Sequence, residues 1–291
     1  MKLSRWSWVV FLGVLVAGGA FADGRRDVQA LRADAAKGDI AAQLSLAGAY
    51  MFGDGVARDE SEALKWYRLA ADQGSADAQM SLGMVYIGGQ GVPKDDKEAV
   101  KWLRLAAEQG LVDAQAMLAG IYATGNGAPQ DETEAVKWLR LAAAKGDAGA
   151  QNNLGWMCAN GRGTAKDPAE AAKWYRLAAD QGFAAAQLTV GQMYTAGFTV
   201  ARDDREALRW YRLAADQGLP QAHLTLGQVY EKGIGVPQDL LASYIEYSKA
   251  AAAGAEGAAQ QRDRLAGKLP ASDLQAAQAK APPTVAKLGG R

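Results

Sequence analysis

Hydrophobic and polar positions recur along this chain with a step of 36 residues. Five tryptophans keep the step: Trp66, Trp102, Trp138, Trp174 and Trp210. Seven glycines and six aspartates keep it too: Gly38, Gly74, Gly110, Gly146, Gly182, Gly218 and Gly254, and Asp59, Asp95, Asp131, Asp167, Asp203 and Asp239. A period of about 20 to 50 residues is typical of solenoids and other repeat arrays. The pattern predicts six full units between residues 39 and 254.

Each unit is predicted to form two helices, as residues 75–110 illustrate. The first helix covers about residues 77–88, and its apolar residues share one face at helical spacing: Ala78, Leu82, Val85 and Tyr86. The second covers about residues 96–109, with its own buried stripe: Ala99, Trp102, Leu103 and Ala106. The glycines at 89, 91 and 110 end the helices and turn the chain. The sequence therefore predicts an all-α protein built from helix pairs.

Recurring small and acidic residues have structural interpretations. Asp95 and Glu98 form a capping-box pattern at the start of the second helix, and equivalent pairs open four further units. We interpret these acids as helix caps rather than as catalytic carboxylates. Gly83 is costly inside a helix, so we expect a neighbouring helix to pack closely against it. The sixth unit departs from the pattern, because Glu246 takes the tryptophan position, as terminal repeats often do.

The ends of the chain differ from the repeats. Residues 1–22 have the features of a secretory signal peptide: Lys2 and Arg5, a ten-residue apolar stretch, and an A-x-A site that places cleavage after Ala22. That apolar stretch is short of the roughly 20 residues that span a bilayer. Residues 23–38 are expected to form an N-terminal capping helix, residues 255–281 C-terminal capping helices, and residues 282–291 a flexible tail.

Composition excludes several classes of function. Lysine plus arginine and aspartate plus glutamate both number 32, and cleavage of the leader would leave a net charge of −2, so nucleic acid is not an expected partner. One cysteine and one histidine allow neither a disulfide framework nor a zinc site of several cysteines. No nucleophile with an activating base is legible. We expect no cofactor, no metal, no catalysis and no stable membrane insertion, and a periplasmic or secreted location.

The repeated motif resembles the Sel1-like repeat, a relative of the tetratricopeptide repeat. In the second unit the motif stands as Ala78, Leu82-Gly83, Tyr86, Gly89, Gly91-Val92, Asp95, Ala99, Trp102, Ala106-Ala107 and Gly110. The resemblance implies a right-handed superhelical α-solenoid of six antiparallel helix pairs, flanked by the capping helices. It also implies an adaptor that binds proteins in signalling, secretion or envelope regulation. The partner, the pathway and the oligomeric state remain open at this stage.

The resemblance further implies a concave groove lined by the first helix of each pair. The positions that vary between copies there are candidates for binding: Met80, Met84, Ile87, Asn152, Trp156, Ala159, Asn160, Leu188, Gln192, Thr195, Leu224, Gln228, Glu231 and Lys232. Asn152, Trp156 and Asn160 share one helix face. Trp156 is either a binding hot spot or a core residue that contributes only stability. Phe198 is a further candidate anchor, because Thr199 breaks the Gly-x-Gly pattern and a different turn is expected.

Two single residues have a structural and a functional interpretation each. Cys158 stands where the other units have tyrosine; it is either a buried small residue or a thiol that pairs with another chain. His223 replaces a recurring glutamine, and we expect it to serve as another polar partner.

Three functions follow, in order of preference. The first is an exported, non-catalytic scaffold that binds a peptide or protein in its groove. The second is binding of the cell wall or a polysaccharide, to which the Trp156 face is suited. The third is a β-lactam hydrolase-like activity, as described for cysteine-rich relatives, and the single cysteine argues against it.

Overall fold

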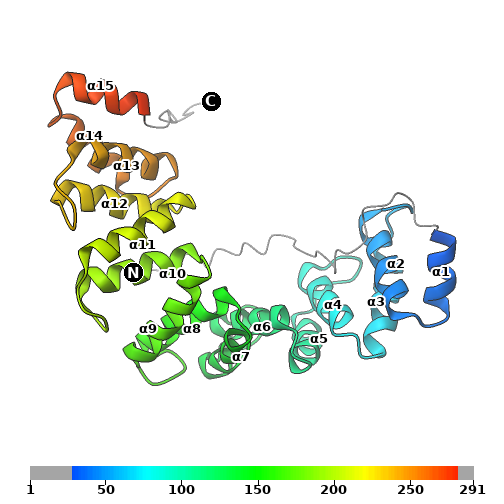
Figure 1. Cartoon of the computed structure of the whole chain (residues 1–291). Coiled ribbons are helices and arrows are strands. Elements are labelled where there is room, and N and C mark those ends of the chain that lie inside the picture. The colour runs from blue at the N-terminus through cyan, green and yellow to red at the C-terminus, as the bar shows by residue number, and fades with distance from the viewer. Residues whose placement is uncertain (1–27, 281–291) are drawn as a thin grey trace. The chain divides into compact units, whose positions relative to one another are not determined.

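The computed structural model describes residues 28–280 and is entirely α-helical in that range (Figure 1). Its fifteen helices are α1 (Val28–Ala36), α2 (Ile40–Phe52), α3 (Glu60–Asp72), α4 (Ala76–Gly88), α5 (Asp96–Glu108), α6 (Val112–Thr124), α7 (Glu132–Ala144), α8 (Ala148–Asn160), α9 (Pro168–Asp180), α10 (Ala184–Ala196), α11 (Asp204–Asp216), α12 (Pro220–Lys232), α13 (Leu240–Ala252), α14 (Ala258–Ala266) and α15 (Ala271–Lys280). The predicted signal peptide and the predicted tail lie outside the described residues.

The helices form sequential antiparallel pairs, one pair per repeat, which confirms the predicted all-α solenoid architecture. We call the first helix of each pair the A helix (α2, α4, α6, α8, α10 and α12) and the second the B helix (α3, α5, α7, α9, α11 and α13). The described chain divides into two compact units, residues 28–131 with α1–α6 and residues 132–280 with α7–α15. None of the described helices combines the length and apolar character that crossing a bilayer requires.

Aspartate side chains cap the B helices, as the sequence predicts. Asp95 Oδ1 accepts hydrogen bonds from the backbone N–H groups of Lys97 and Glu98, at 3.0 and 3.1 Å. The reciprocal half of the predicted capping box does not form at this helix. The backbone N–H of Asp95 donates to the carbonyl of Tyr86 at 3.1 Å, which closes the A–B turn instead. The same turn bond recurs at every later B helix of the array, and at α3 before it.

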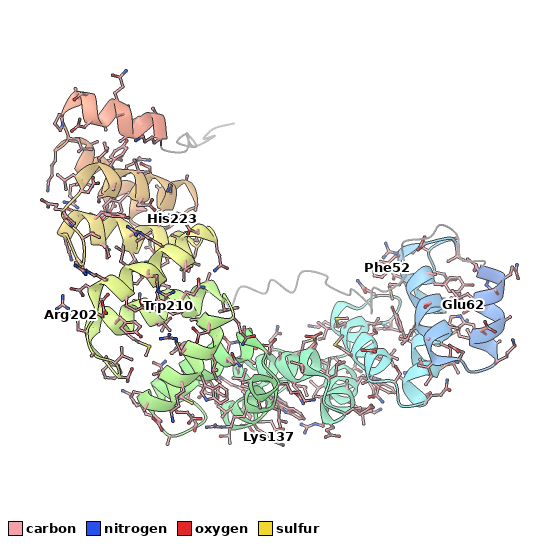
Figure 2. All side chains as sticks on the ribbon, in the orientation of Figure 1. Phe52, Glu62, Lys137, Arg202, Trp210 and His223 are labelled. Carbon is pink, nitrogen blue, oxygen red and sulfur yellow. The ribbon has the colours of Figure 1, made fainter. Side chains whose placement is uncertain are left out.

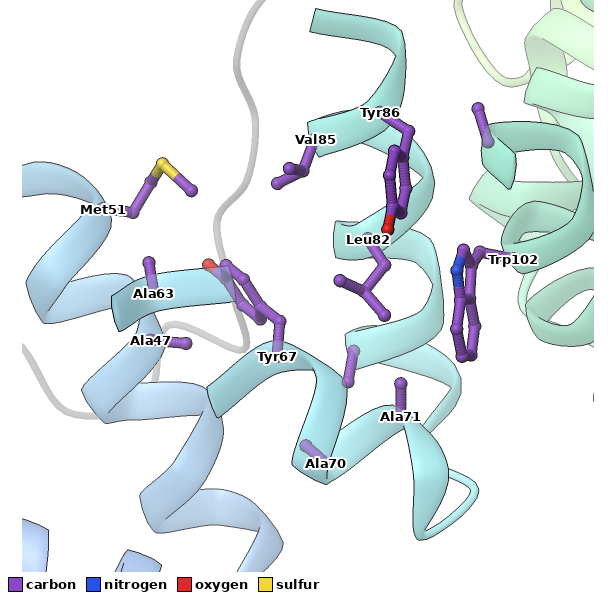
Figure 3. Packing of buried hydrophobic residues seen from close by; sticks show 12 residues of the cluster. Ala47, Met51, Ala63, Tyr67, Ala70, Ala71, Leu82, Val85, Tyr86 and Trp102 are labelled. Atoms are coloured by element: carbon purple, nitrogen blue, oxygen red, sulfur yellow. The ribbon is translucent and has the colours of Figure 1, made fainter. Parts of the chain in front are cut away.

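Close helix packing explains the glycines inside A helices. A Cβ added to Gly83 would lie 2.6 Å from Leu103 Cγ, and one added to Gly227 would lie 2.5 Å from Tyr247 Cδ1. The first unit shows what this approach achieves, because Leu82, Tyr67 and Trp102 enter one buried cluster together (Figure 3). The prediction that a small residue allows a neighbouring helix to pack closely is confirmed.

The A–B turns keep one backbone conformation even where the glycine pattern breaks. Five of the six turns place their second glycine in the left-handed region, for example Gly55 at φ +71° and Gly235 at φ +69°. Thr199 occupies the same position in the fifth turn and also has a positive φ, +66°. The expectation of a different turn conformation there is therefore wrong. Thr199 therefore adopts a backbone conformation that favours glycine.

The last two helices cover the sixth repeat. Leu265 of α14 and Ala277 of α15 are fully buried and pack in one cluster with Tyr244 and Tyr247 of α13. Arg264 of α14 also forms an ion pair with Glu231 of α12 at 2.6 Å. The two predicted C-terminal helices thus lie against the last repeat.

Candidate functional site

Two hydrogen-bond systems join successive helix pairs wherever the repeats follow the common pattern. In the first, a B-helix arginine donates to the hydroxyl of a tyrosine 18 residues later, as Arg68 does to Tyr86 at 2.7 Å. In the second, an A-helix glutamine donates to a backbone carbonyl of the preceding helix and accepts from a glutamine 30 residues later. Gln79, for example, accepts from Gln109 at 2.8 Å. These recurring side chains hold the stack together, so departures from them mark candidate sites.

The fourth repeat departs from the tyrosine pattern, at Cys158. Without a tyrosine to bind, Arg140 forms a bidentate pair with Glu170 of α9, at 2.5 and 3.2 Å. Glu170 also accepts a hydrogen bond from Trp174 Nε1 at 3.2 Å. These contacts, Arg140 above all, lower the pKa of Glu170 to about 2 although partial burial opposes the shift. Glu170 is therefore ionised, and the ion pair charged, near neutral pH.

Cys158 itself is fully buried. Burial is the main reason that its pKa rises to about 11, and the neighbouring charge of Glu170 adds to the shift. The thiol is thus neutral near pH 7 and enclosed by protein. This corrects the interpretation of Cys158 as an intermolecular thiol, because a second chain has no access to its sulfur in the folded protein.

Trp156 lies two residues before Cys158 on α8, and its side chain is only partly buried. The guanidinium of Arg162 stands over its ring, 5.9 Å from the centroid. Arg162 is also ion-paired with Glu132, so the charge next to the indole is neutralised. Asn160 donates to the backbone carbonyl of Trp156 at 2.8 Å. Arg162 thus contacts the indole, and part of the Trp156 side chain stays accessible.

The A-helix position of Trp156 carries amides in the next two repeats. Gln192 of α10 and Gln228 of α12 occupy this position, and both side chains are exposed. Neither has an intramolecular hydrogen bond among the described residues. Asn152, one turn before Trp156 on α8, is partly buried. Its side-chain Nδ2 donates to Asn153 Oδ1 at 3.4 Å. The A-helix face of α8, α10 and α12 thus offers one indole and several amides, with no isolated charge beside the indole.

The other candidates do not all join this face. Met80 and Met84 are partly buried and Ile87 is exposed, all three on α4 in the first unit, whereas the remaining candidates belong to the second. Phe198 is 57% exposed in the turn after α10. Leu188 and Leu224 were expected in the groove, but both are buried. Leu188 lies in a cluster with residues of α11 and α12, and Leu224 in a cluster with residues of α13, α14 and α15. At those two positions the groove assignment is wrong.

His223 has the polar role that the sequence suggests. Its Nδ1 lies 2.6 Å from Glu246 Oε2, and both side chains are largely buried (Figure 2 labels His223). Lys249 also donates to Glu246, at 2.7 Å. Burial raises the pKa of Glu246, but the bonds from His223 and Lys249 outweigh it, and the net shift is downward. Among the described residues no cluster of three potential metal ligands exists.

The sequence reasoning missed an apolar row on the B helices. Leucines that recur every 36 residues are between 37% and 48% exposed: Leu69, Leu105, Leu141, Leu177 and Leu213. These leucines show that some recurring positions face solvent and do not hold the stack together. The signal in the sequence that marks these leucines is their exact spacing of 36 residues.

Comparison with protein families settles what kind of chain this is. The Sel1 repeat profile matches six consecutive segments: residues 40–75, 76–111, 112–147, 148–183, 184–219 and 220–254. The chain belongs to the Sel1 repeat family. Sel1 repeats generally mediate protein interactions. A comparison with curated proteins finds no match.

Solved structures match this chain to different degrees. A Sel1 repeat protein from Oxalobacter formigenes is 31% identical, with a TM-score of 0.73 over 91% of this chain and 80% of that one. A protective antigen of uropathogenic Escherichia coli with an SLR fold is 25% identical, with a TM-score of 0.47 over 87% and 78% of the two chains. An immunity protein from Pseudomonas aeruginosa is 20% identical, with a TM-score of 0.41 over 75% and 83%.

Proposed function

We propose that this Sel1 repeat protein is an exported, non-catalytic scaffold that binds a peptide or protein of the cell envelope. The partner lies on the A-helix face of α8, α10 and α12. The observation that carries the proposal is the position shared by Trp156, Gln192 and Gln228: a partly exposed indole followed by two exposed amides without intramolecular partners. Tryptophan is enriched among residues that contribute most to protein binding.

The chemistry of this face suits a peptide segment. The indole supplies apolar area, and an amide side chain can both donate to and accept from a peptide backbone. Because the helices already hold these residues in fixed positions, little conformational freedom is lost on binding. Glu132 neutralises Arg162 beside the indole, so we expect only a modest dependence of the affinity on salt.

The titratable groups nearby favour binding without chemistry. A neutral, enclosed Cys158 is a poor nucleophile, and Glu170 is held as the carboxylate by Arg140. Neither group has the pKa near neutrality that suits general acid–base catalysis. Export rests on residues 1–22 alone, and N-terminal sequencing of the protein from a periplasmic fraction tests it. The expected first residue is Asp23, and an intact leader in the cytoplasm contradicts export.

Affinity capture from an envelope extract tests the site. Trp156→Gln introduces the residue that Gln192 and Gln228 show to be tolerated at this position. Leu177→Gln on α9 is the matched control, because it removes an exposed apolar side chain from a B helix. We expect a protein that wild type and Leu177→Gln retain and that Trp156→Gln loses, with unchanged circular dichroism in both variants.

Two results contradict the proposal. Equal retention by wild type and Trp156→Gln moves the site away from α8. Retention of purified cell wall, with no protein held by wild type, favours the polysaccharide-binding alternative.

A further inference from the structure

Charge is distributed unevenly over the helices of the second unit. Helices α8 and α10 have 13 residues each, and neither contains an aspartate, glutamate, lysine or arginine. The B helices that alternate with them, α9 and α11, each carry both acidic and basic side chains. The A-helix face is therefore neutral over α8 and α10, whereas the B-helix side of the same repeats is charged.

The end of α12 departs from this neutrality. Lys232 is the last residue of α12, and its side chain is exposed. It lies one helical turn after Gln228 and so shares the face of that amide. Asn160 holds the equivalent place on α8, one turn after Trp156. Among the described residues, the Lys232 ammonium has no ion-pair partner and no hydrogen-bond acceptor.

The neighbouring acid does not neutralise Lys232. Glu231 accepts hydrogen bonds from Arg264 of α14 at 2.6 Å and from the hydroxyl of Tyr247 at 3.0 Å. Its charge is thus matched by Arg264. His223, near the start of α12, is paired with Glu246 of α13. Lys232 therefore supplies an uncompensated positive charge at one end of a neutral face.

We propose that the bound segment is uncharged where it crosses α8 and α10 and carries an acidic side chain that pairs with Lys232. This inference rests on the proposed function and names the chemistry of its partner. A charged residue over α8 or α10 would lose hydration and find no opposite charge there. A carboxylate over the end of α12 meets the Lys232 ammonium, and this pairing fixes the direction in which the segment lies.

The carboxylate comes from a side chain and not from a chain terminus. Capture of a terminal carboxylate uses a nest of free backbone N–H groups. At the end of α12 the N–H groups of Gly233 and Ile234 both donate to the carbonyl of Val229. A helix C-terminus also carries a partial negative charge of roughly half a unit, which reduces the full charge of Lys232 but does not cancel it. The site thus offers one point charge.

A short extended segment is long enough to reach both ends of this face. Helices α8, α10 and α12 follow one another along the second unit (Figure 1). Three helices with their side chains are about 30 to 36 Å wide. Twelve extended residues span up to about 40 Å. One segment can therefore place an apolar side chain on Trp156 and an acid on Lys232, at a constant spacing in its sequence.

Selection from a library of random twelve-residue peptides displayed on phage tests this chemistry. The immobilised full chain is the target, and Lys232→Glu, Lys173→Glu and Trp156→Gln are selected in parallel, with circular dichroism to confirm their folding. Lys173 is the matched control, because it is an exposed lysine of α9 that also has no ion pair among the described residues. The peptides are joined to the phage coat protein at their C-termini, so only side chains supply carboxylates.

We expect wild type and Lys173→Glu to enrich the same peptides, with an apolar and an acidic residue at one spacing and uncharged residues beside the apolar one. Lys232→Glu should enrich lysine or arginine in place of the acid. A synthetic copy of the wild-type peptide should bind Lys232→Glu about fivefold more weakly, because an exposed ion pair contributes little.

An acid that Lys232→Glu still selects overturns the inference, and so do charged residues beside the apolar position. Failure of the proposed function gives a different result. If Trp156→Gln selects the same apolar residue as wild type, the binding face itself is wrong. If wild type enriches no peptide, both the face and its chemistry are contradicted.

Discussion

His223 Nδ1 on α12 lies 2.6 Å from Glu246 Oε2 on α13. Both residues are departures of the sixth repeat, since His223 replaces a recurring glutamine and Glu246 replaces a recurring tryptophan. The two changes compensate each other, because each supplies the hydrogen-bond partner that the other needs in a largely buried place. The sixth repeat therefore has its own side-chain pair, His223 with Glu246.

This pairing predicts a measurable coupling. His223→Ala leaves the buried carboxylate of Glu246 with Lys249 alone, so we expect a loss of about 1 to 3 kcal/mol in the free energy of unfolding. Glu246→Gln should cost a similar amount, and the double variant less than the sum of the two. Urea unfolding of the four proteins gives the coupling energy. Additive costs would show that the two side chains do not interact.

The Arg140–Glu170 pair predicts a dependence of stability on pH. The pKa of Glu170 falls from an ordinary 4.5 to about 2 in the folded protein. A lowered folded-state pKa gives stability that is present above 4.5 and is lost as pH falls toward 2. We expect Glu170→Gln to lose about 1 kcal/mol at pH 6, after solvent screening is allowed for, and little or nothing near pH 2. Urea unfolding at several pH values checks this, and parallel stability curves for both proteins contradict it.

The burial of Cys158 predicts that its thiol does not react with reagents while the protein is folded. Native protein should react with DTNB only as fast as it opens, and unfolded protein should react at once. Ala165→Cys, at an exposed position in the following turn, is the positive control for accessibility. Rapid labelling of Cys158 in native protein would restore the intermolecular thiol hypothesis.

Two helical glycines of the first unit predict opposite effects of the same substitution. Gly83→Ala forces a Cβ to within 2.6 Å of Leu103 Cγ, so we expect a destabilisation of about 1 to 3 kcal/mol. Gly48 has no atom within 4 Å of an added Cβ, and Gly48→Ala should stabilise its helix by about 1 kcal/mol. Thermal unfolding compares both variants with wild type. If Gly83→Ala is as stable as wild type, the close approach is not needed.

The repetition of the sequence explains why so much of the fold was predictable. Each structural position is sampled in several copies, so Trp102, Asp95 and Gly83 reveal their roles through their equivalents. The helix pairs and both C-terminal helices follow the predicted ranges within one or two residues. The predicted capping box is confirmed only in half, because the sequence does not show that the Asp95 N–H donates to the carbonyl of Tyr86.

The candidate site was less predictable for physical reasons. Repetition shows that a position matters, but it does not distinguish buried from exposed, so the row that contains Leu177 went unnoticed. Conversely, Leu188 and Leu224 vary with their repeat and are nevertheless buried. Variation identifies Trp156 as unusual, yet the sequence does not show that its side chain is partly buried or that Arg162 stands over its ring.

A hydrogen–deuterium exchange footprint of the bound partner tests the central claim most directly. The protein captured by wild type would be added to the full chain, and exchange compared with the free chain. We expect slower exchange in α8, α10 and α12, centred on Trp156, with α7, α9 and α11 unchanged. Slower exchange confined to α7, α9 and α11 would place the partner on the exposed leucines instead, and would contradict binding on the A-helix face.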